Sequence, residues 1–513
     1  MVVHVSADSH GGKPAPTQEA GSGQLRAGSI GVPSAMVMSI AIMAPAAGMI
    51  FLPQVVASHA GAAVPLVYLM SLIGCLFIAG TITQFARLVP HAGSFYAYDA
   101  VGLGRTTGFV SGWLLMAGYF VFYPQNLLAA AYFTSATLRE ELGWNINWSI
   151  WVVLFAVVIW LLSTRGIRTS MRTDLTVVGI ESLIILIVVG GILIAGGAHG
   201  NTTQVFTLSA TDGHGWNGIF LGMVFAMLTF VGFEGAATLG EETGDARRNV
   251  PRAIWAAVIG CGLFFLLTSY ALAVGYGPHG GSAFATAAGT PMYDMAVKYV
   301  GSGLGVAVNI AGIVSAFAVC LACNNASTRV LFAMGRDDVL PGGLGRTHRV
   351  FKTPARAINL VGFAALALSL LVGLAVGPYP SGYADIGQFG TIPILILYIL
   401  ACLSLIVYMR RLHRSGAVRY NWFKHLIAPA IGIVIVFLPI YGSVWPWPPW
   451  PLNLITVMIF VFLAAGIAIG IWLRKRPDHL GDRIAFLLAT GGDATPESVE
   501  GEGPAAATQT SAP

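Results

Sequence analysis

Length, composition and charge exclude most classes of soluble protein. The chain has 513 residues, of which 56% are hydrophobic and only 10% are charged, whereas a soluble globular domain carries about 25% charged residues. The formal net charge of +5 would suit nucleic acid or another acidic partner, but the positions of the basic residues, given below, argue against that interpretation.

Twelve apolar stretches approach the roughly 20 residues that a helix needs to cross the hydrocarbon core of a bilayer. Polar turns or basic loops separate them. They begin near Ser29, Val64, Thr106, Ile146, Leu175, Trp216, Ala253, Gly303, Ala357, Gln388, Leu426 and Leu452. The sequence therefore predicts an all-α membrane protein with about twelve transmembrane helices.

The basic residues predict the orientation of these helices. If the amino terminus is cytoplasmic, 25 of the 27 Lys and Arg residues fall in cytoplasmic segments, and only Arg139 and Lys298 fall outside. An excess of Lys and Arg in cytoplasmic loops is the usual orientation signal of membrane proteins. We expect a multi-pass protein of the cell (cytoplasmic) membrane with both termini inside. Its basic residues face the lipid bilayer's inner side and do not form a nucleic-acid surface.

The two ends of the chain are polar. Residues 1–28 are Gly/Pro-rich and lack the apolar stretch of a secretory signal, and residues 477–513 have a similar character. We expect cytoplasmic tails there, the first of them disordered, on either side of one membrane domain, residues 29–476.

Two predicted spans carry helix-breaking residues near their middles. The first contains Ala44-Pro45-Ala46-Ala47-Gly48, and the sixth contains Val231-Gly232-Phe233-Glu234-Gly235. Proline lacks an N–H group and glycine loosens the helix. Breaks at corresponding places in two five-helix halves are typical of transporters built from inverted repeats, with the binding site at the bilayer midplane. Ordinary glycine-mediated helix packing is the alternative explanation.

Polar and ionisable residues inside the spans are candidates for function. Glu234, beside the second break, is either a protonatable coupling or gating group or a carboxylate that ties freed N–H groups together. Glu181, in the fifth span, suits a helix–helix hydrogen bond as well as a coupling role. Polar residues in the third and eighth spans either line a cavity or hold helices together: Tyr119, Gln125, Asn126, Asn309 and Ser315.

Three segments carry a recognisable pattern: Pro90–Tyr98 with the sequence PHAGSFYAY, Gly232–Ile254 around the end of the sixth span, and Ser327–Pro341 after the eighth. The first is similar to the motif P-x-A-G-G-x-Y-x-Y of the amino acid–polyamine–organocation (APC) superfamily of secondary transporters. The other two resemble that family's sixth helix with its cytoplasmic loop and the loop after its eighth helix. The resemblance extends from about Gly28 to Arg476.

The resemblance implies a leucine-transporter-type fold, with ten core helices in two inverted repeats (29–200 and 201–412) and two peripheral helices (426–476). It implies that a substrate carboxylate meets N–H groups of the first break, that an ammonium meets carbonyls of the second, and that Phe230 and Phe233 form a wall or gate. It also matches Glu234 to a recurrent family glutamate of gating and, in some members, proton linkage. The expected substrate-binding residues are Ala44, Pro45, Ala46, Ala47, Gly48, Phe230, Val231, Gly232, Phe233, Tyr119 and Asn126.

Two departures from the family pattern bear on the substrate and the coupling ion. The family's usual G-S-G in helix 1 is replaced by Pro45-Ala46-Ala47-Gly48, which leaves room for an amine or another organic solute. The lysine that some relatives place in helix 5 is absent, and Glu181 stands in that helix instead. A sodium site between helix-1 carbonyls and Ser315 is conceivable. Coupling to H⁺ or Na⁺, or exchange, therefore stays open.

Charged residues of the cytoplasmic loops predict a network at the inner mouth. Acidic and basic residues alternate after the sixth and eighth spans, and we expect them to pair and to favour an outward-open arrangement. They are Glu241, Glu242, Asp245, Arg247, Arg248, Arg252, Arg336, Asp337 and Asp338.

These features together predict a permease that carries amino acids or related small nitrogenous solutes by alternating access. A polyamine or amine carrier is the alternative, and a membrane channel or sensor is the alternative from another class. A channel needs a continuous polar stripe, whereas the polar residues here are isolated. No G-x-x-x-x-G-K-[ST] sequence occurs, which excludes the usual ATP-driven pump. We expect no enzymatic activity, no cofactor and no metal.

Overall fold

The computed structural model describes residues 31–89, 94–165, 171–239, 243–336, 353–448, 450 and 452–474, and every regular element in these ranges is a helix. The helices that contain the predicted spans are α1 (Val32–Met43), α2 (Pro45–Ala60), α3 (Val64–Leu88), α5 (Arg105–Leu142), α6 (Trp148–Thr164), α7 (Met171–Ile194), α8 (Gly215–Leu228), α9 (Ala246–Tyr276), α12 (Ser302–Arg336), α13 (Ala355–Val376), α14 (Tyr383–Arg414), α15 (Ala428–Val444) and α16 (Leu452–Arg474). Shorter elements are α4 (Phe95–Leu103), η1 (Gln204–Phe206), η2 (Leu208–Thr211), η3 (Phe233–Leu239), α10 (Gly281–Ala285), α11 (Pro291–Tyr299), η4 (Pro378–Gly382) and η5 (Phe423–Ile427).

A helix lies at each of the twelve predicted spans. In the described ranges, ten helical segments are long and apolar enough to cross a membrane. Helix α6 has 17 residues and α8 has 14, so both are apolar but shorter than a full crossing. The all-α membrane fold is confirmed, while the count of twelve crossings stays a prediction.

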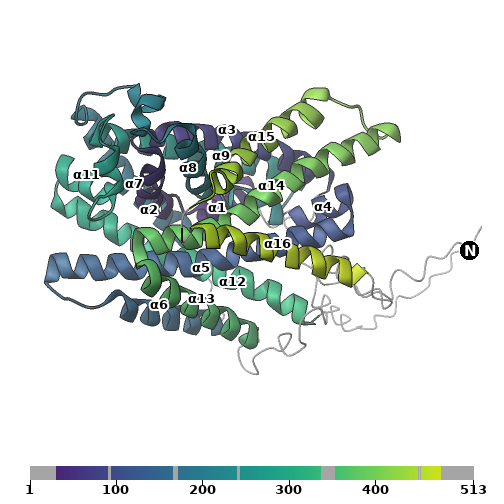
Figure 1. The fold of residues 1–513 in the computed structure, drawn as a ribbon. Helices are drawn as coiled ribbons and strands as arrows, with labels where there is room; N and C mark the ends of the chain where they lie inside the picture. The colour runs from purple at the N-terminus through teal and green to yellow at the C-terminus, as the bar shows by residue number, and fades with distance from the viewer. Residues whose placement is uncertain are drawn as a thin grey trace, which may run out of the picture.

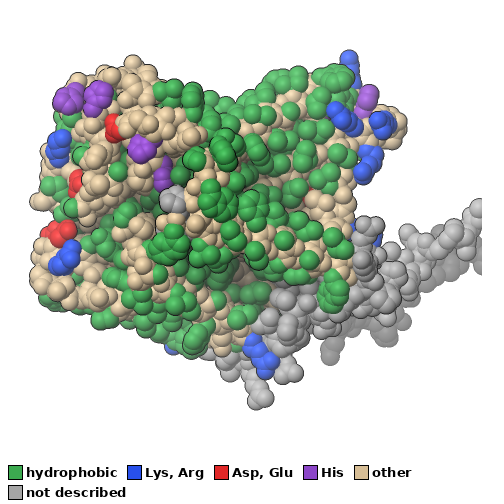
Figure 2. All heavy atoms as spheres, viewed as in Figure 1, with side chains coloured by type: hydrophobic (Ala, Val, Ile, Leu, Met, Phe, Trp, Pro, Cys, Tyr) green, Lys and Arg blue, Asp and Glu red, His purple; other side chains and the backbone are tan. Residues whose placement is uncertain are grey.

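The surface has the character of a lipid-facing protein. On the face shown in Figure 2, hydrophobic side chains cover a broad band, and most of the visible charged side chains lie toward its two ends. Phe363 and Leu374 of α13 are 76% and 73% exposed. So many exposed large apolar groups would be unfavourable in water, and a bilayer removes that cost.

Helix α5 is the framework of the bundle. Its 38 residues pack along α12 and α14, and α16 lies against both α5 and α14 (Figure 1). Gly118 allows the close approach of α5 to α14, because a Cβ atom there would lie 2.5 Å from Cδ1 of Ile394. These helices fix the positions of the groups described below.

The short helix α4, between the second and third spans, carries a buried carboxylate. Asp99 is fully buried, and its Oδ2 accepts a hydrogen bond of 2.5 Å from the Ser111 hydroxyl. Burial raises the pKa of Asp99 to about 7, and the hydrogen bond from Ser111 opposes that rise. The Arg411 guanidinium donates to the last carbonyl groups of α4 and so holds the helix against α14.

Several predicted features lie outside the described residues. They are the tails at 1–28 and 477–513, the stretch Pro90–Gly93, and four acidic residues of the inner mouth, Glu241, Glu242, Asp337 and Asp338. Of the predicted network, Arg248 Nε lies 3.8 Å from Asp245 Oδ2, with side chains 76% and 57% exposed. An exposed pair contributes only about 0–1 kcal/mol, so the network stays a prediction.

Candidate functional site

The first span is divided at a single residue. Helix α1 ends at Met43, α2 begins at Pro45, and Ala44 between them adopts the left-handed conformation with φ 43° and ψ 65°. Pro45 holds the first position of α2, where a missing N–H does no harm because the first N–H groups of a helix have no intrahelical partner. The predicted break is therefore sharper than the sequence suggested, and 46–48 form the first turn of α2.

A side chain from another helix binds the beginning of α2. The N–H of Ala47 donates to Oγ of Ser315 in α12 over 3.3 Å. The carboxyl group of Glu181 in α7 lies near this hydroxyl. A hydroxyl that accepts from an N–H can donate its own proton to a carboxylate. All three residues are buried, so a Ser315 hydroxyl that turned from Ala47 to Glu181 would connect the helix break to α7.

The sixth span unwinds after α8 ends at Leu228. Gly232 has φ 110°, a conformation that a residue with a side chain rarely adopts, and the 3₁₀-helix η3 begins at the next residue. A Cβ atom on Gly232 would also lie 2.4 Å from Cγ2 of Ile42 in α1. Glycine is therefore required twice here, for its backbone conformation and for the approach of the first span to the sixth.

Glu234 braces this second break. Its Oε2 accepts hydrogen bonds from the N–H of Gly232 at 3.0 Å and from the hydroxyl of Tyr398 at 3.1 Å. Its Oε1 is buried without a hydrogen-bond partner in the described part of the chain, and Tyr119 and Cys75 lie nearby. One oxygen thus ties a freed N–H to α14, while the other has none of the contacts that a buried carboxylate usually makes.

Ser39 of α1 connects the first span to η3 in the sixth span. Its Oγ accepts from the N–H of Ala236 at 2.9 Å and donates to the carbonyl of Phe233 at 2.8 Å. One hydroxyl therefore connects α1 to η3 twice. The sequence analysis missed this residue, because a lone serine in an apolar span has no distinguishing pattern.

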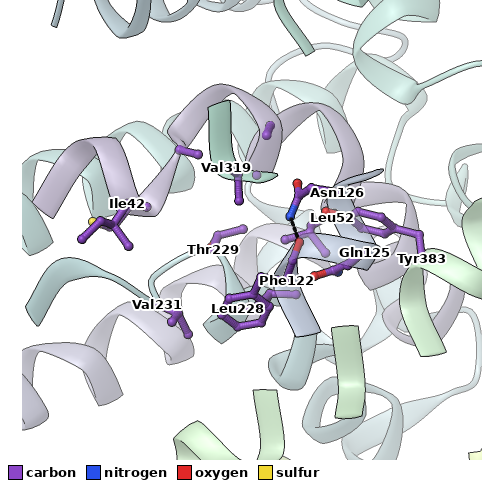
Figure 3. A pocket seen from close by; sticks show the side chains of 14 residues that line it. Ile42, Leu52, Phe122, Gln125, Asn126, Leu228, Thr229, Val231, Val319 and Tyr383 are labelled. Carbon is purple, nitrogen blue, oxygen red and sulfur yellow. Dashed lines mark hydrogen bonds between the residues drawn. The ribbon is translucent and has the colours of Figure 1, made fainter. Parts of the chain in front are cut away.

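A cavity of about 50 Å³ lies where the two breaks face each other (Figure 3). Five of the predicted substrate-binding residues line it: Ala44, Ala47, Gly48, Val231 and Asn126. Gln125, predicted as a possible lining residue, lines it too. The remaining eight were not predicted as site residues: Ile42, Met43, Leu52, Phe122, Leu228, Thr229, Val319 and Tyr383. Thr229 could have been sought beside the second break, because it directly precedes Phe230.

The lining is neutral, and polar and apolar atoms contribute about equally to its exposed surface. None of the described residues around the cavity is charged. Asn126 Nδ2 donates to the Phe122 carbonyl over 2.9 Å (Figure 3), which leaves its Oδ1 without a partner among the described residues. Gln125 Nε2 is likewise buried and unpartnered in this part of the structure. Two amide side chains can therefore contact a polar ligand, while the other walls suit an apolar one.

The other predicted site residues lie away from the cavity. Phe230 packs edge-on against Phe265 with ring centroids 5.1 Å apart, and the Phe233 ring is 5.8 Å from that of Tyr398. Both rings pack against aromatic rings of other helices and do not line the cavity, so their role as a wall or gate stays a prediction. Pro45, Ala46, Gly232, Tyr119, Glu181, Glu234 and Ser315 also do not line the cavity.

Aromatic rings from α2, α5, η4 and α14 form a cluster that reaches the cavity at Tyr383. Phe51 of α2 stacks on Phe133 of α5 at 4.9 Å, and the Tyr379 hydroxyl donates to the Phe51 carbonyl over 2.8 Å. Tyr383, which lines the cavity, lies 6.0 Å from Phe51. These residues are far apart in the sequence, so no local pattern predicted the cluster.

The cavity is small for an organic ligand. A protein cavity that binds benzene, a ligand of six heavy atoms, has a volume of about 150 Å³, and this one has about 50 Å³. A cavity of this size is too small for an amino acid, so binding requires its walls to separate.

Comparison with known proteins gives a consistent group of relatives. A family model described as amino acid permease matches residues 30–461. The low-affinity putrescine importer PlaP of Escherichia coli (strain K12) is 27% identical over 391 residues, which cover 74% of this chain and 80% of that protein. The methylthioribose transporter of Bacillus subtilis (strain 168) is 25% identical over 358 residues, covering 67% and 75%. The branched-chain amino acid permease BcaP of the same organism is 26% identical over 373 residues, covering 67% and 74%. The family match includes both breaks and the whole cavity lining.

Proposed function

The chain belongs to the amino acid permease family, and from that premise we propose that it carries a small apolar amino acid across the membrane by alternating access. It is a multi-pass membrane protein, and its named relatives are transporters. The substrate, the coupling and the orientation given below are our proposals.

The proposed substrate class rests on the neutral lining of the central cavity. An amino acid zwitterion has no net charge, so it suits walls without charged side chains. Its carboxylate would meet the positive end of the α2 dipole, and its ammonium would meet backbone carbonyls of the second break. A diamine such as putrescine would lose the hydration of two cations with no carboxylate among the described lining residues to replace it. A polyamine carrier is therefore the less favoured alternative.

The Ala47 N–H group, which we expect to bind the substrate carboxylate, is already hydrogen-bonded to Ser315. Because the Ala47 N–H already donates to Ser315 Oγ, substrate binding requires this 3.3 Å contact to lengthen or break. Once released from Ala47, the Ser315 hydroxyl would be free to donate to the nearby Glu181 carboxyl group. We propose that this exchange of partners links substrate binding to α7, with Glu181 and Glu234 as the two candidates for proton coupling. Exchange of internal for external substrate and coupling to Na⁺ are the alternatives.

We propose that both termini are cytoplasmic. The support is the 25 of 27 basic residues that this orientation places inside. We further propose that residues 29–200 and 201–412 form two inverted repeats, with 426–476 as peripheral helices. The first and sixth spans lie together, since Ser39 of α1 bonds both Phe233 and Ala236 of η3, and this supports the arrangement.

Uptake into proteoliposomes tests the proposal. Labelled leucine should enter, should compete with unlabelled valine and alanine, and should exchange with internal leucine in counterflow. Putrescine and methylthioribose, which the names of two relatives suggest, serve as competing substrates. Uptake of putrescine without leucine would favour the amine carrier. Saturable counterflow excludes a channel, because a channel does not exchange solute molecules one for one.

A further inference from the structure

A second cavity lies between α5, α12, α13, α14 and α16. Its volume is about 370 Å³, several times that of the central one. Ser327 and Asp385 are among its lining residues, but no polar atom is exposed at its surface. Ala117 and Val121 of α5 line it, while Phe122 and Asn126 of α5 line the central cavity. At 3.6 residues per turn these pairs occupy opposite faces of α5. The two cavities are therefore distinct and share α5 as a wall.

Water cannot occupy this second cavity stably. A buried water needs two to four polar partners, and an apolar cavity offers none. The proposed amino acid substrate is excluded for the same reason, because its charged groups would lose their hydration. An unfilled cavity of this size is also unfavourable, because the side chains around it lose their packing partners. The occupant is therefore apolar.

The surroundings identify the apolar molecule. All five helices around the cavity belong to membrane-spanning segments. Its outer walls, α13 and α16, both pack on α5 (Figure 1) and carry residues that face lipid, such as Leu374 at 73% and Val461 at 63% exposure. In the hydrocarbon core the abundant apolar molecules are lipid acyl chains. Met116 and Met458 in the lining have flexible thioether side chains that adapt to such a chain.

We propose that this second cavity binds one acyl chain of a membrane lipid. The chain would lie against Ala117 and Val121 on one side and against Val372 and Met458 on others. The inference does not depend on which solute the protein transports.

A photoreactive lipid tests the proposal. The full-length protein is reconstituted with phosphatidylcholine that carries a diazirine in the middle of one acyl chain, irradiated, and mapped by peptide mass spectrometry. Wild-type protein should be labelled at residues 116–121 and 455–462. Val372→Phe, which fills the cavity, should reduce that labelling at least tenfold, which corresponds to about 1.4 kcal/mol.

Two further variants control the experiment. Leu374→Phe adds an aromatic ring to the lipid-facing side of the same helix and should keep wild-type labelling. Ala117→Leu fills the cavity from α5 and should reproduce the loss, so that a folding defect in one filling variant does not decide the result. Labelling confined to outward-facing positions such as Leu374 and Val461, or labelling unchanged in both filling variants, would overturn the proposal.

Discussion

Tyr398 of α14 donates its phenolic hydrogen bond to Glu234, across the break in the sixth span, over 3.1 Å. The same carboxylate oxygen accepts from the N–H of Gly232. Glu234 is therefore at once a brace for the unwound segment and a buried ionisable group with one unpartnered oxygen. Its two proposed roles, scaffold and proton carrier, can be separated by substitution.

Glu234→Gln keeps the size of the side chain and an acceptor oxygen but cannot titrate. If Glu234 couples transport to protons, the variant should bind and exchange substrate but lose accumulation driven by a pH gradient. Uptake into proteoliposomes with acid outside buffer measures this at equal reconstituted protein. Tyr398→Phe is the control, because it removes one hydrogen bond, about 1 kcal/mol, and leaves the carboxyl group titratable. Gradient-driven accumulation at the wild-type level in Glu234→Gln would leave Glu181 as the candidate.

Gly48→Leu should abolish substrate binding. A Cβ atom at Gly48 would lie 3.2 Å from Cγ2 of Thr229, so a larger side chain forces the two breaks apart and fills the cavity. Overpacking of about 3 kcal/mol corresponds to more than about 100-fold in affinity. Equilibrium binding of labelled leucine measures the loss. Gly362→Leu is the matched control, since no atom lies within 4 Å of its added Cβ. Normal affinity in Gly48→Leu would place the site elsewhere.

Asn126→Asp should shift the preference of the central cavity toward amines. The change puts a carboxylate into a lining that has no charged residue among those described. A hydrogen bond to a charged group contributes about 1.5–3 kcal/mol, so putrescine affinity should rise about tenfold or more while leucine uptake falls. Competition assays compare the two ligands. Asn309→Asp carries the same charge change at a residue that bonds Thr137 outside the cavity, and it should leave the preference unaltered. An equal response in both variants would contradict the site.

Asp99 should make stability depend on pH. Burial raises the pKa of Asp99 to about 7 from an ordinary 3.8, so between these values the folded protein holds a proton that the unfolded chain has released. The contribution of Asp99 to the free energy of unfolding should therefore fall as the pH rises from about 4 to about 7 and then level off. Asp99→Asn should remove this component. Thermal unfolding of both proteins in detergent from pH 5 to 8 measures the difference, and parallel curves would contradict the assignment.

The proposed orientation can be read from cysteine accessibility. The five native cysteines are buried, which keeps background labelling low. Trp447→Cys, at a position 56% exposed, should react with a membrane-impermeant maleimide added outside intact cells. Lys424→Cys should react only after the membrane is opened. Reaction of Lys424→Cys in intact cells would reverse the proposed topology.

The sequence predicted the helices and the breaks better than it predicted the cavity. Spans and breaks are local properties: apolar runs favour membrane helices, and Pro45 and Gly232 disturb them wherever they stand. The resemblance to the family then indicated which two breaks meet. Which side chains face the space between them depends on the rotation of each helix, and a few tens of degrees decide it. That is why Phe230 and Phe233, predicted as walls, lie in helix packing, while Phe122 and Tyr383 line the cavity.

The contacts between distant segments were the least predictable. Ser315, Glu181 and Glu234 were each singled out as buried polar groups, but nothing local indicated that Ser315 would bind Ala47. Likewise, the contact of Phe51 with Phe133 joins α2 to α5, which are separated in the chain by an entire span. Tertiary packing sets these pairs, and single-sequence patterns do not record it.

The double hydrogen bond of Ser39 has a mechanical consequence. Because its hydroxyl holds both the N–H of Ala236 and the carbonyl of Phe233, α1 and η3 share one joint. Next to this connection each span has a residue with positive φ, Ala44 after α1 and Gly232 before η3, about which the helix can rotate. We therefore expect α1 and η3 to move together as one rigid unit, by rotation about Ala44 and Gly232. Opening of the cavity on the side of these two helices would then be a single concerted movement.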